Sequence, residues 1–181
     1  MPVDTRLTYE DLCALPNDGK RYEIIEGELF VTPAPRSLHQ VVVANLHLAL
    51  GQFVKSQGLG RVFLAPLDVV LSEFDVVEPD LLYISKAHGS RLTEANLRGA
   101  PDLAIEVLSE TSAKLDRTAK LKLYARFGVQ EYWIIDPDGP SAEIYRHKQK
   151  RLAMVSKLSA SGTLSSPLFP GFSLLLRELV D

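Results

Sequence analysis

The chain has 181 residues, of which 46% are hydrophobic and 24% charged, and its formal net charge is −3. These are the proportions of one globular domain that buries its own core, so we expect a single domain spanning residues 1–181. The near-neutral charge excludes a generally basic nucleic-acid-binding surface, and any phosphate must be met by local basic residues or by bound cations.

The cysteine content and the start of the chain bear on its location. Cys13 is the single cysteine, which excludes an internal disulfide and a thiolate metal cluster. The opening residues, MPVDTRLTYEDL, contain no apolar segment like that of a signal peptide, and no stretch is long enough to cross a bilayer. We therefore expect a soluble, cytoplasmic protein with no membrane partner.

The first third of the chain predicts a helix, a hairpin and a second helix. A short helix capped by Thr8 is expected to end before Pro16. The segment RYEIIEGELFVT (21–32) alternates apolar and polar residues about Gly27, which predicts two short strands as an N-terminal hairpin extension. Apolar residues then recur at helical spacing from Ser37 to Val54.

The rest of the chain is rich in predicted strands. Apolar runs indicate strands within 61–72, 80–85, 101–109 and 130–137, and a final hairpin within 143–158. A helix is expected from Ser112 to Phe127, stopped by Gly128. This order predicts a mixed α/β fold with a mixed sheet flanked by helices.

Two acidic residues stand out in this predicted sheet. Glu106 lies inside an apolar strand, where an ionised carboxylate is costly unless it is paired, hydrogen-bonded or bound to metal. Asp102 shares its strand face but is roughly 13 Å away at about 3.3 Å per residue. Asp80, at the start of the neighbouring apolar run, is the better partner. In the alternative interpretation Asp80 is a turn residue and Glu106 pairs with an arginine.

The helix from Ser112 supplies a lysine for the same site. Its apolar stripe runs through Leu115, Ala119, Leu123 and Phe127, with Tyr124 beside it. At roughly 100° per residue, Asp116 and Lys120 fall on the same packed side. The structural interpretation is an i, i+4 pair with a snorkelling lysine. The functional one is a lysine aimed at a metal site, where it stabilises charge on a phosphoryl group or handles the attacking water.

These motifs together resemble a known family. EPDLLYIS, GAPDLAIEVLSETS, the positions Asp116, Lys120 and Tyr124, and GVQEYWIIDP, preceded by RYEIIEGEL and by His39 opening a helix, resemble the Uma family of "putative restriction endonucleases", in the PD-(D/E)XK nuclease superfamily. The resemblance spans about Leu7 to Phe172. It implies a restriction-endonuclease-like core with Asp80 and Glu106 as metal ligands.

One position departs from the superfamily pattern. A lysine is expected two residues after the glutamate, where this chain has Leu108. The resemblance therefore implies that Lys120 acts as the catalytic lysine from the following helix. It also makes Glu23 a candidate supporting acid, although alternation alone leaves open whether Glu23 or Glu26 points inward. His39 is a further candidate for contacting phosphate or water, with a capping or exposed histidine as the alternative.

The function expected from these residues is metal-dependent hydrolysis of DNA phosphodiester bonds by an endonuclease. Asp80 and Glu106, with the backbone carbonyl of Val107, would hold Mg²⁺ or Mn²⁺, which prefer oxygen ligands. The catalytic set is Asp80, Glu106 and Lys120, supported by Glu23, Asp116, His39 and Tyr124. The alternative is an impaired nuclease-fold protein that binds nucleic acid or a protein without cleaving.

Possible partners follow from this function. A homodimer is compatible with cutting both strands of a duplex, because most oligomers are symmetric. The basic run RHKQKR at 146–151 could contact a nucleic-acid backbone, but a solvated hairpin tip is the favoured interpretation.

Overall fold

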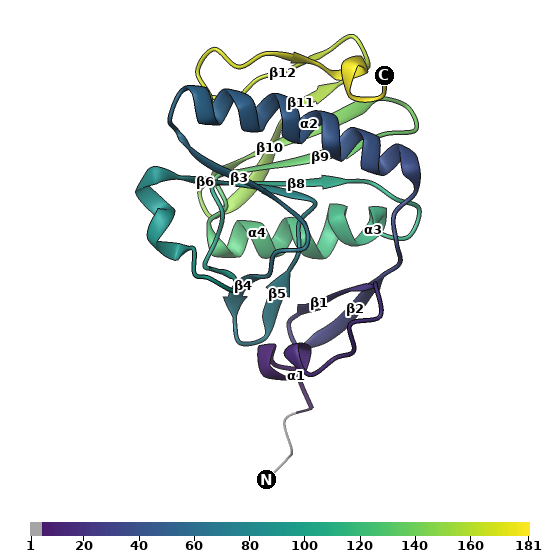
Figure 1. Cartoon of the computed structure of the whole chain (residues 1–181), viewed down its shortest axis with the longest axis vertical. Helices are drawn as coiled ribbons and strands as arrows, with labels where there is room; N and C mark the ends of the chain where they lie inside the picture. The colour runs from purple at the N-terminus through teal and green to yellow at the C-terminus, as the bar shows by residue number, and fades with distance from the viewer. Residues whose placement is uncertain (1–4) are drawn as a thin grey trace.

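A six-stranded mixed sheet is the centre of the fold in the computed structural model, which describes residues 5–181 (Figure 1). Its order is β11-β10-β9-β8-β6-β3, and within it only the β8–β9 pair is parallel. The strands are β3 (Gly60–Leu64), β6 (Leu81–Ser85), β8 (Leu103–Val107), β9 (Glu131–Asp136), β10 (Ser141–Lys148) and β11 (Arg151–Leu158).

Helices cover both faces of this sheet. The long helix α2 (Ser37–Ser56) crosses one face, and α3 (Ala113–Leu115) and α4 (Leu121–Phe127) lie on the other (Figure 1). The apolar stripe of α2, which includes Val42, Leu46 and Leu50, packs with Leu103, Ile105 and Val107. The opposite side of β8 faces Leu123 and Tyr124 of α4. The predicted mixed α/β fold is confirmed.

A second sheet lies at the N-terminal end of the molecule, with the order β2-β1-β5-β4-β7 (Figure 1). Its strands are β1 (Arg21–Ile25), β2 (Glu28–Thr32), β4 (Val69–Ser72), β5 (Asp75–Val77) and β7 (Leu97–Arg98), and α1 (Tyr9–Cys13) packs against β1. Thr8 caps α1 in a capping box with Asp11. The predicted hairpin is present, and Glu26 and Gly27 form its turn with positive φ.

Short elements complete the chain. They are 3₁₀ helices at Lys86–Arg91 and Leu176–Leu179, and the strand pair β12 (Thr163–Leu164) and β13 (Leu174–Leu175). The C-terminal 3₁₀ helix packs against α2. Within residues 5–181, no helix is long and apolar enough to cross a membrane.

The helical segment after β8 contains an irregularity that the sequence did not predict. Residues Asp116–Lys120 form a π-helical turn between α3 and α4, within the predicted helix 112–127. A π turn inserts an extra residue and often occurs at functional sites. Here both ends of the turn are buried, whereas Arg117 and Thr118 between them are exposed. Gly128, with φ of 81°, ends α4 as predicted.

Candidate active site

Strand pairing brings the two predicted metal ligands together. In the antiparallel β6–β8 pair, Leu81 lies opposite Ile105. Asp80 precedes Leu81 and Glu106 follows Ile105, so this register puts the two carboxylate residues side by side at one end of the pair. Both residues are buried, with relative exposures of 3% and 2%.

Asp80 is held in its ionised form by three donors. Arg21 Nη1 lies 2.6 Å from Oδ1, while His39 Nε2 lies 3.1 Å from Oδ2 and the N–H of Val107 donates to Oδ2 at 2.8 Å. Burial by itself raises the pKa of a carboxyl group, but His39, Arg21 and the Val107 N–H outweigh it and lower the pKa of Asp80 to about 2.

Glu106 has a different environment on the α4 side of the sheet. Its Oε1 accepts hydrogen bonds from Lys120 Nζ at 2.9 Å and from the Tyr124 hydroxyl at 3.0 Å. Burial raises the pKa of Glu106 well above its usual value, and although Lys120 opposes this rise, the negative charges of Asp116, Asp80 and Glu23 add to it.

Lys120 is the centre of the cluster. Its ammonium group contacts Glu106 and Glu23 at 2.9 Å each and lies 3.6 Å from Asp116 Oδ1. Burial lowers the pKa of a lysine, but these three carboxylates outweigh it and raise the pKa of Lys120 above its usual value. The i, i+4 pair with Asp116 is therefore one part of a larger set of interactions, and Lys120 is directed at the carboxylates of the sheet.

Glu23 comes to the site from the second sheet. Alternation left its direction open, and the structure turns Glu23 and Ile25 towards the large sheet while Glu26 is exposed. Besides Lys120, Oε1 of Glu23 accepts the N–H of Glu78 at 2.8 Å. Burial, together with Asp68 and Glu23, raises the pKa of Glu78 to about 7. The site thus lies where the two sheets meet.

Acidic side chains outnumber basic ones in this cluster. The permanently cationic side chains are Arg21 and Lys120, and they face the four buried carboxylates of Glu23, Asp80, Glu106 and Asp116. Both carboxylate oxygens of Asp116 are buried without a hydrogen-bond partner among residues 5–181, and burial raises its pKa. An additional cation would favour the ionised forms of these carboxyl groups.

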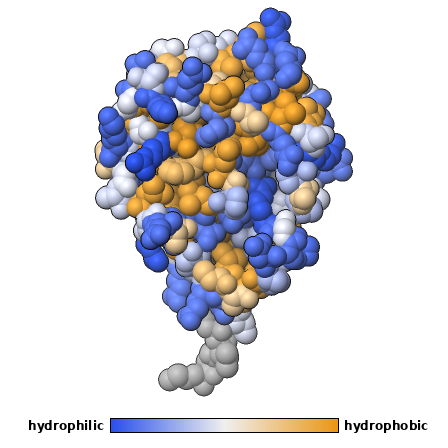
Figure 2. All heavy atoms as spheres, viewed as in Figure 1, coloured by the Kyte–Doolittle hydropathy of each residue, from blue (hydrophilic) through white to orange (hydrophobic). Residues whose placement is uncertain are grey.

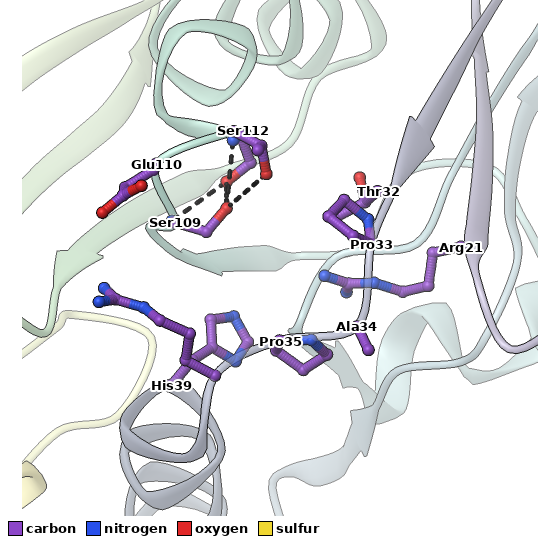
Figure 3. A pocket seen from close by; sticks show the side chains of 11 residues that line it. Arg21, Thr32, Pro33, Ala34, Pro35, His39, Ser109, Glu110 and Ser112 are labelled. Carbon is purple, nitrogen blue, oxygen red and sulfur yellow. Dashed lines mark hydrogen bonds between the residues drawn. The ribbon is translucent and has the colours of Figure 1, made fainter.

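Two clefts lead to the site from the surface. One, of about 150 Å³, lies between residues 32–36 and the turn 109–112. The other, of about 560 Å³, reaches Asp80 between the N-terminal hairpin and α2. Arg21 and His39 line both, and in Figure 3 their side chains point into the space beneath the turn containing Ser109 and Ser112. Asp80 is therefore approached past Arg21 and His39.

The donor atoms suit a hard divalent cation. Mg²⁺ is commonly bound by one or two carboxylates and keeps several waters. Asp80 and Glu106 supply the carboxylates, and the carbonyl of Val107 lies on the same edge of β8 as the N–H that meets Asp80. Residues 5–181 contain no ready-made group of three or more acidic, histidine or cysteine side chains that could hold a metal. A metal would have to displace Arg21 from Asp80 and draw Glu106 from Lys120.

The structure brings all the predicted side chains into one cluster. They are Glu23, His39, Asp80, Glu106, Asp116, Lys120 and Tyr124, all buried. Asp102, which strand spacing set apart, instead pairs with His88 at 2.7 Å. Leu108, at the usual lysine position, is packed in the core with Tyr124 and Leu123.

Arg21 is the site residue that sequence reasoning missed. It lies two residues before Glu23 on β1, and alternate strand residues share a face, so an inward Glu23 also implies an inward Arg21. That signal was present in RYEIIEGEL. It could not be used because the direction of Glu23 was undecided.

Comparison with known proteins identifies the family and the fold of this chain. The chain has the mixed sheet flanked by helices that is expected for a restriction-endonuclease-like protein. The chain belongs to the Uma2 family, described as "Putative restriction endonuclease", whose family model matches residues 8–177. The predicted resemblance is confirmed.

A solved structure has the same fold. It is described as a "putative nuclease belonging to DUF820 from Anabaena variabilis ATCC 29413". The two chains are 23% identical, with a TM-score of 0.79, over 96% of this chain and 97% of the other. The search of curated proteins found no match to this chain.

Proposed function

We propose that this protein is a metal-dependent endonuclease that hydrolyses DNA phosphodiester bonds. The observation that carries the proposal is the adjacency of Asp80 and Glu106 on paired strands, with Lys120 2.9 Å from Glu106 and a cleft reaching Asp80. Family membership supports nuclease chemistry. Mg²⁺ or Mn²⁺ and a DNA substrate are the specific parts of the proposal.

The residues have distinct roles in this proposal. Asp80 and Glu106, with the Val107 carbonyl, would hold the cation, which when bound polarises the phosphate and lowers the pKa of water. Lys120 stabilises negative charge on the phosphoryl group or orients the attacking water. Tyr124 orients Glu106 through its hydroxyl, and His39 orients Asp80. Glu23 and Asp116 keep Lys120 charged and fixed in place.

Plasmid cleavage tests the proposal. We expect the wild-type protein to nick supercoiled DNA with Mg²⁺ or Mn²⁺, and Asp80→Ala, Glu106→Ala and Lys120→Ala each to lose on the order of 100-fold or more in rate. Asp138→Ala is the matched control, because Asp138 is an exposed carboxylate paired with Arg36. Circular dichroism confirms folding of each variant. Activity unchanged in all three site variants would overturn the assignment.

A second candidate is a nuclease-fold protein that binds without cleaving. The favouring observation is that Asp80 is paired with Arg21 and Glu106 with Lys120, so that both proposed ligands already have cationic partners. Calorimetric titration separates the two functions. Binding of Mg²⁺ or Mn²⁺ that is lost in Glu106→Ala supports the enzyme, whereas no heat at near-physiological concentrations supports the non-catalytic protein.

A further inference from the structure

A groove runs along α2 beside the edge strand β3. Its part nearest the site, the 560 Å³ cleft, is lined by Gln40, Val43 and Ala44 of α2 and by residues 64–66. Its far part, of about 780 Å³, is lined by α2 residues from His47 to Lys55 and by residues 60–63. Because α2 and β3 run in opposite directions, the two parts follow the same pair of elements end to end. We call this feature the α2–β3 groove.

One stripe of α2 forms the wall of this groove. Gln40, Ala44, His47, Gly51 and Lys55 recur at intervals of three or four residues, which places them on one face of the helix. The small residues Ala44 and Gly51 leave space along this face of the helix. At 1.5 Å per residue, the stripe from Gln40 to Lys55 is about 22 Å long, enough for several nucleotides.

The groove differs in charge from the rest of the molecule. Although the chain contains 23 acidic residues, α2 and β3 contain none. The far part of the groove carries the cations Lys55 and Arg61, both exposed, together with His47. Among the described residues that line the groove, the only carboxylates are Glu78 and Asp80, at its site end. The exposed cations of the far part thus lie away from the carboxylates at the site end.

Apolar side chains form much of the remaining surface. Leu48 is 67% exposed and Leu64 is 38% exposed, and Phe63 lies partly exposed in the far part. Figure 2 shows hydrophobic residues gathered on this face of the molecule below α2, with hydrophilic residues around them. Cations that track a backbone beside apolar and aromatic side chains are the means by which proteins bind single strands without sequence preference.

We propose that the α2–β3 groove holds one nucleic-acid strand, with its backbone against Lys55 and Arg61 and the phosphate to be cut at Asp80. The inference rests on the proposed nuclease function and adds the path of the substrate. It predicts a preference for strands long enough to reach from Asp80 to the far end. Charge complementarity, continuity with the site cleft and length all point to this occupant.

Binding measured in metal-free buffer with a chelator tests the groove apart from cleavage. The probes are fluorescent single-stranded oligodeoxynucleotides of about 4 and about 12 nucleotides, followed by anisotropy over a range of salt concentrations. The variant is Lys55→Gln with Arg61→Gln. The matched control is Lys157→Gln with Arg177→Gln, which removes the same charge from exposed positions on β11 and on the C-terminal 3₁₀ helix, outside the groove.

We expect the wild type and the control to bind the longer strand more tightly than the shorter one. The groove variant should lose this preference for the longer strand. The magnitude of its slope of log affinity against log salt concentration should fall by about 1.4, because two phosphate contacts are removed and each contributes about 0.7. Equal affinities in the wild type and groove variant, equal losses in the control, or no wild-type binding at either length would overturn the inference.

The result is separable from the proposed hydrolysis. If the groove variant loses binding but plasmids are not cleaved with Mg²⁺ or Mn²⁺, strand binding in the groove is supported and the proposed hydrolysis is wrong. If plasmids are cleaved but the groove variant binds like the wild type, the proposed hydrolysis is supported and strand binding in the groove is wrong.

Discussion

The position of Lys120 accounts for a leucine at residue 108. Leu108 is packed against α4, so a lysine there would have to bury its charge in an apolar layer. Lys120 approaches Glu106 from the helix above that layer and finds two further carboxylates, Glu23 and Asp116. The ammonium group therefore reaches the same strand residue from another element. Its burial is tolerated because three acidic side chains surround it.

Arg21 gives the first prediction at this scale. Its Nη1 lies 2.6 Å from Asp80 Oδ1, so a metal ion bound as proposed would compete with the guanidinium for this carboxylate. We expect Arg21→Gln to bind Mn²⁺ more tightly, on the order of fivefold, because about 1 kcal/mol of competing ion pairing is removed. Isothermal titration calorimetry measures the change.

Arg36→Gln is the control for Arg21→Gln. Arg36 lines the same cleft but pairs with the exposed Asp138, so its removal takes away an equal charge without freeing Asp80. An equal gain in affinity in both variants would indicate a general charge effect. Unchanged or weaker binding in Arg21→Gln would show that Arg21 supports the ligand set and does not compete with the metal.

At the scale of elements, the π turn and the C-terminal end of the helix after β8 determine which of its side chains reach the site. Its π turn holds Asp116 and Lys120 inward, and Tyr124 lies one turn further on. Gly128 then ends α4 in the left-handed conformation, and Val129 leads into β9. A helix that continued past residue 128 would displace β9, the strand that pairs with β8 and keeps Glu106 in place.

Gly128→Ala tests this termination. A Cβ at residue 128 meets no heavy atom within 4 Å, so its cost comes only from φ of 81°. We expect a loss of roughly 1–2 kcal/mol in the free energy of unfolding, measured with urea. Gly139→Ala is the matched control, since that site is equally open and its φ is not in the left-handed region. A loss of the same size in Gly139→Ala would contradict the backbone explanation.

The sequence predicted those parts of the site that depend on local periodicity. The faces of β8 and of the 113–127 helix follow from spacing, so Glu106 and Lys120 could be assigned their directions in advance. The direction of Glu23 and the pairing of Arg21 with Asp80 depend on how the second sheet docks on the first. The Arg21–Asp80 contact joins residues 59 positions apart, and no local pattern encodes contacts of this kind. The π turn escaped prediction because ordinary helical spacing fits the same residues.

At the scale of the whole molecule, the site lies where the two sheets meet. Glu23 comes from the smaller sheet and Glu106 from the larger one, Asp80 immediately precedes β6 of the larger sheet, and Asp116 comes from the helical segment that covers it. Their mutual repulsion acts across the boundary between these parts, with Arg21 and Lys120 as partial compensation. The docking of the N-terminal hairpin on the large sheet therefore depends on the charge balance of the site.

A hard divalent cation should consequently stabilise the entire fold. At 100 times its dissociation constant, a ligand that binds only the folded state adds about 2.7 kcal/mol. For a chain of this size that corresponds to a rise in Tm of roughly 5–10 °C. We expect Mn²⁺ or Mg²⁺ to produce this shift in calorimetry of the wild type, while NaCl at the same ionic strength does not. Glu106→Gln, which removes a proposed ligand, should show no shift. Equal shifts with NaCl and Mn²⁺ would mean that screening of the surface, and not binding between the sheets, stabilises the protein.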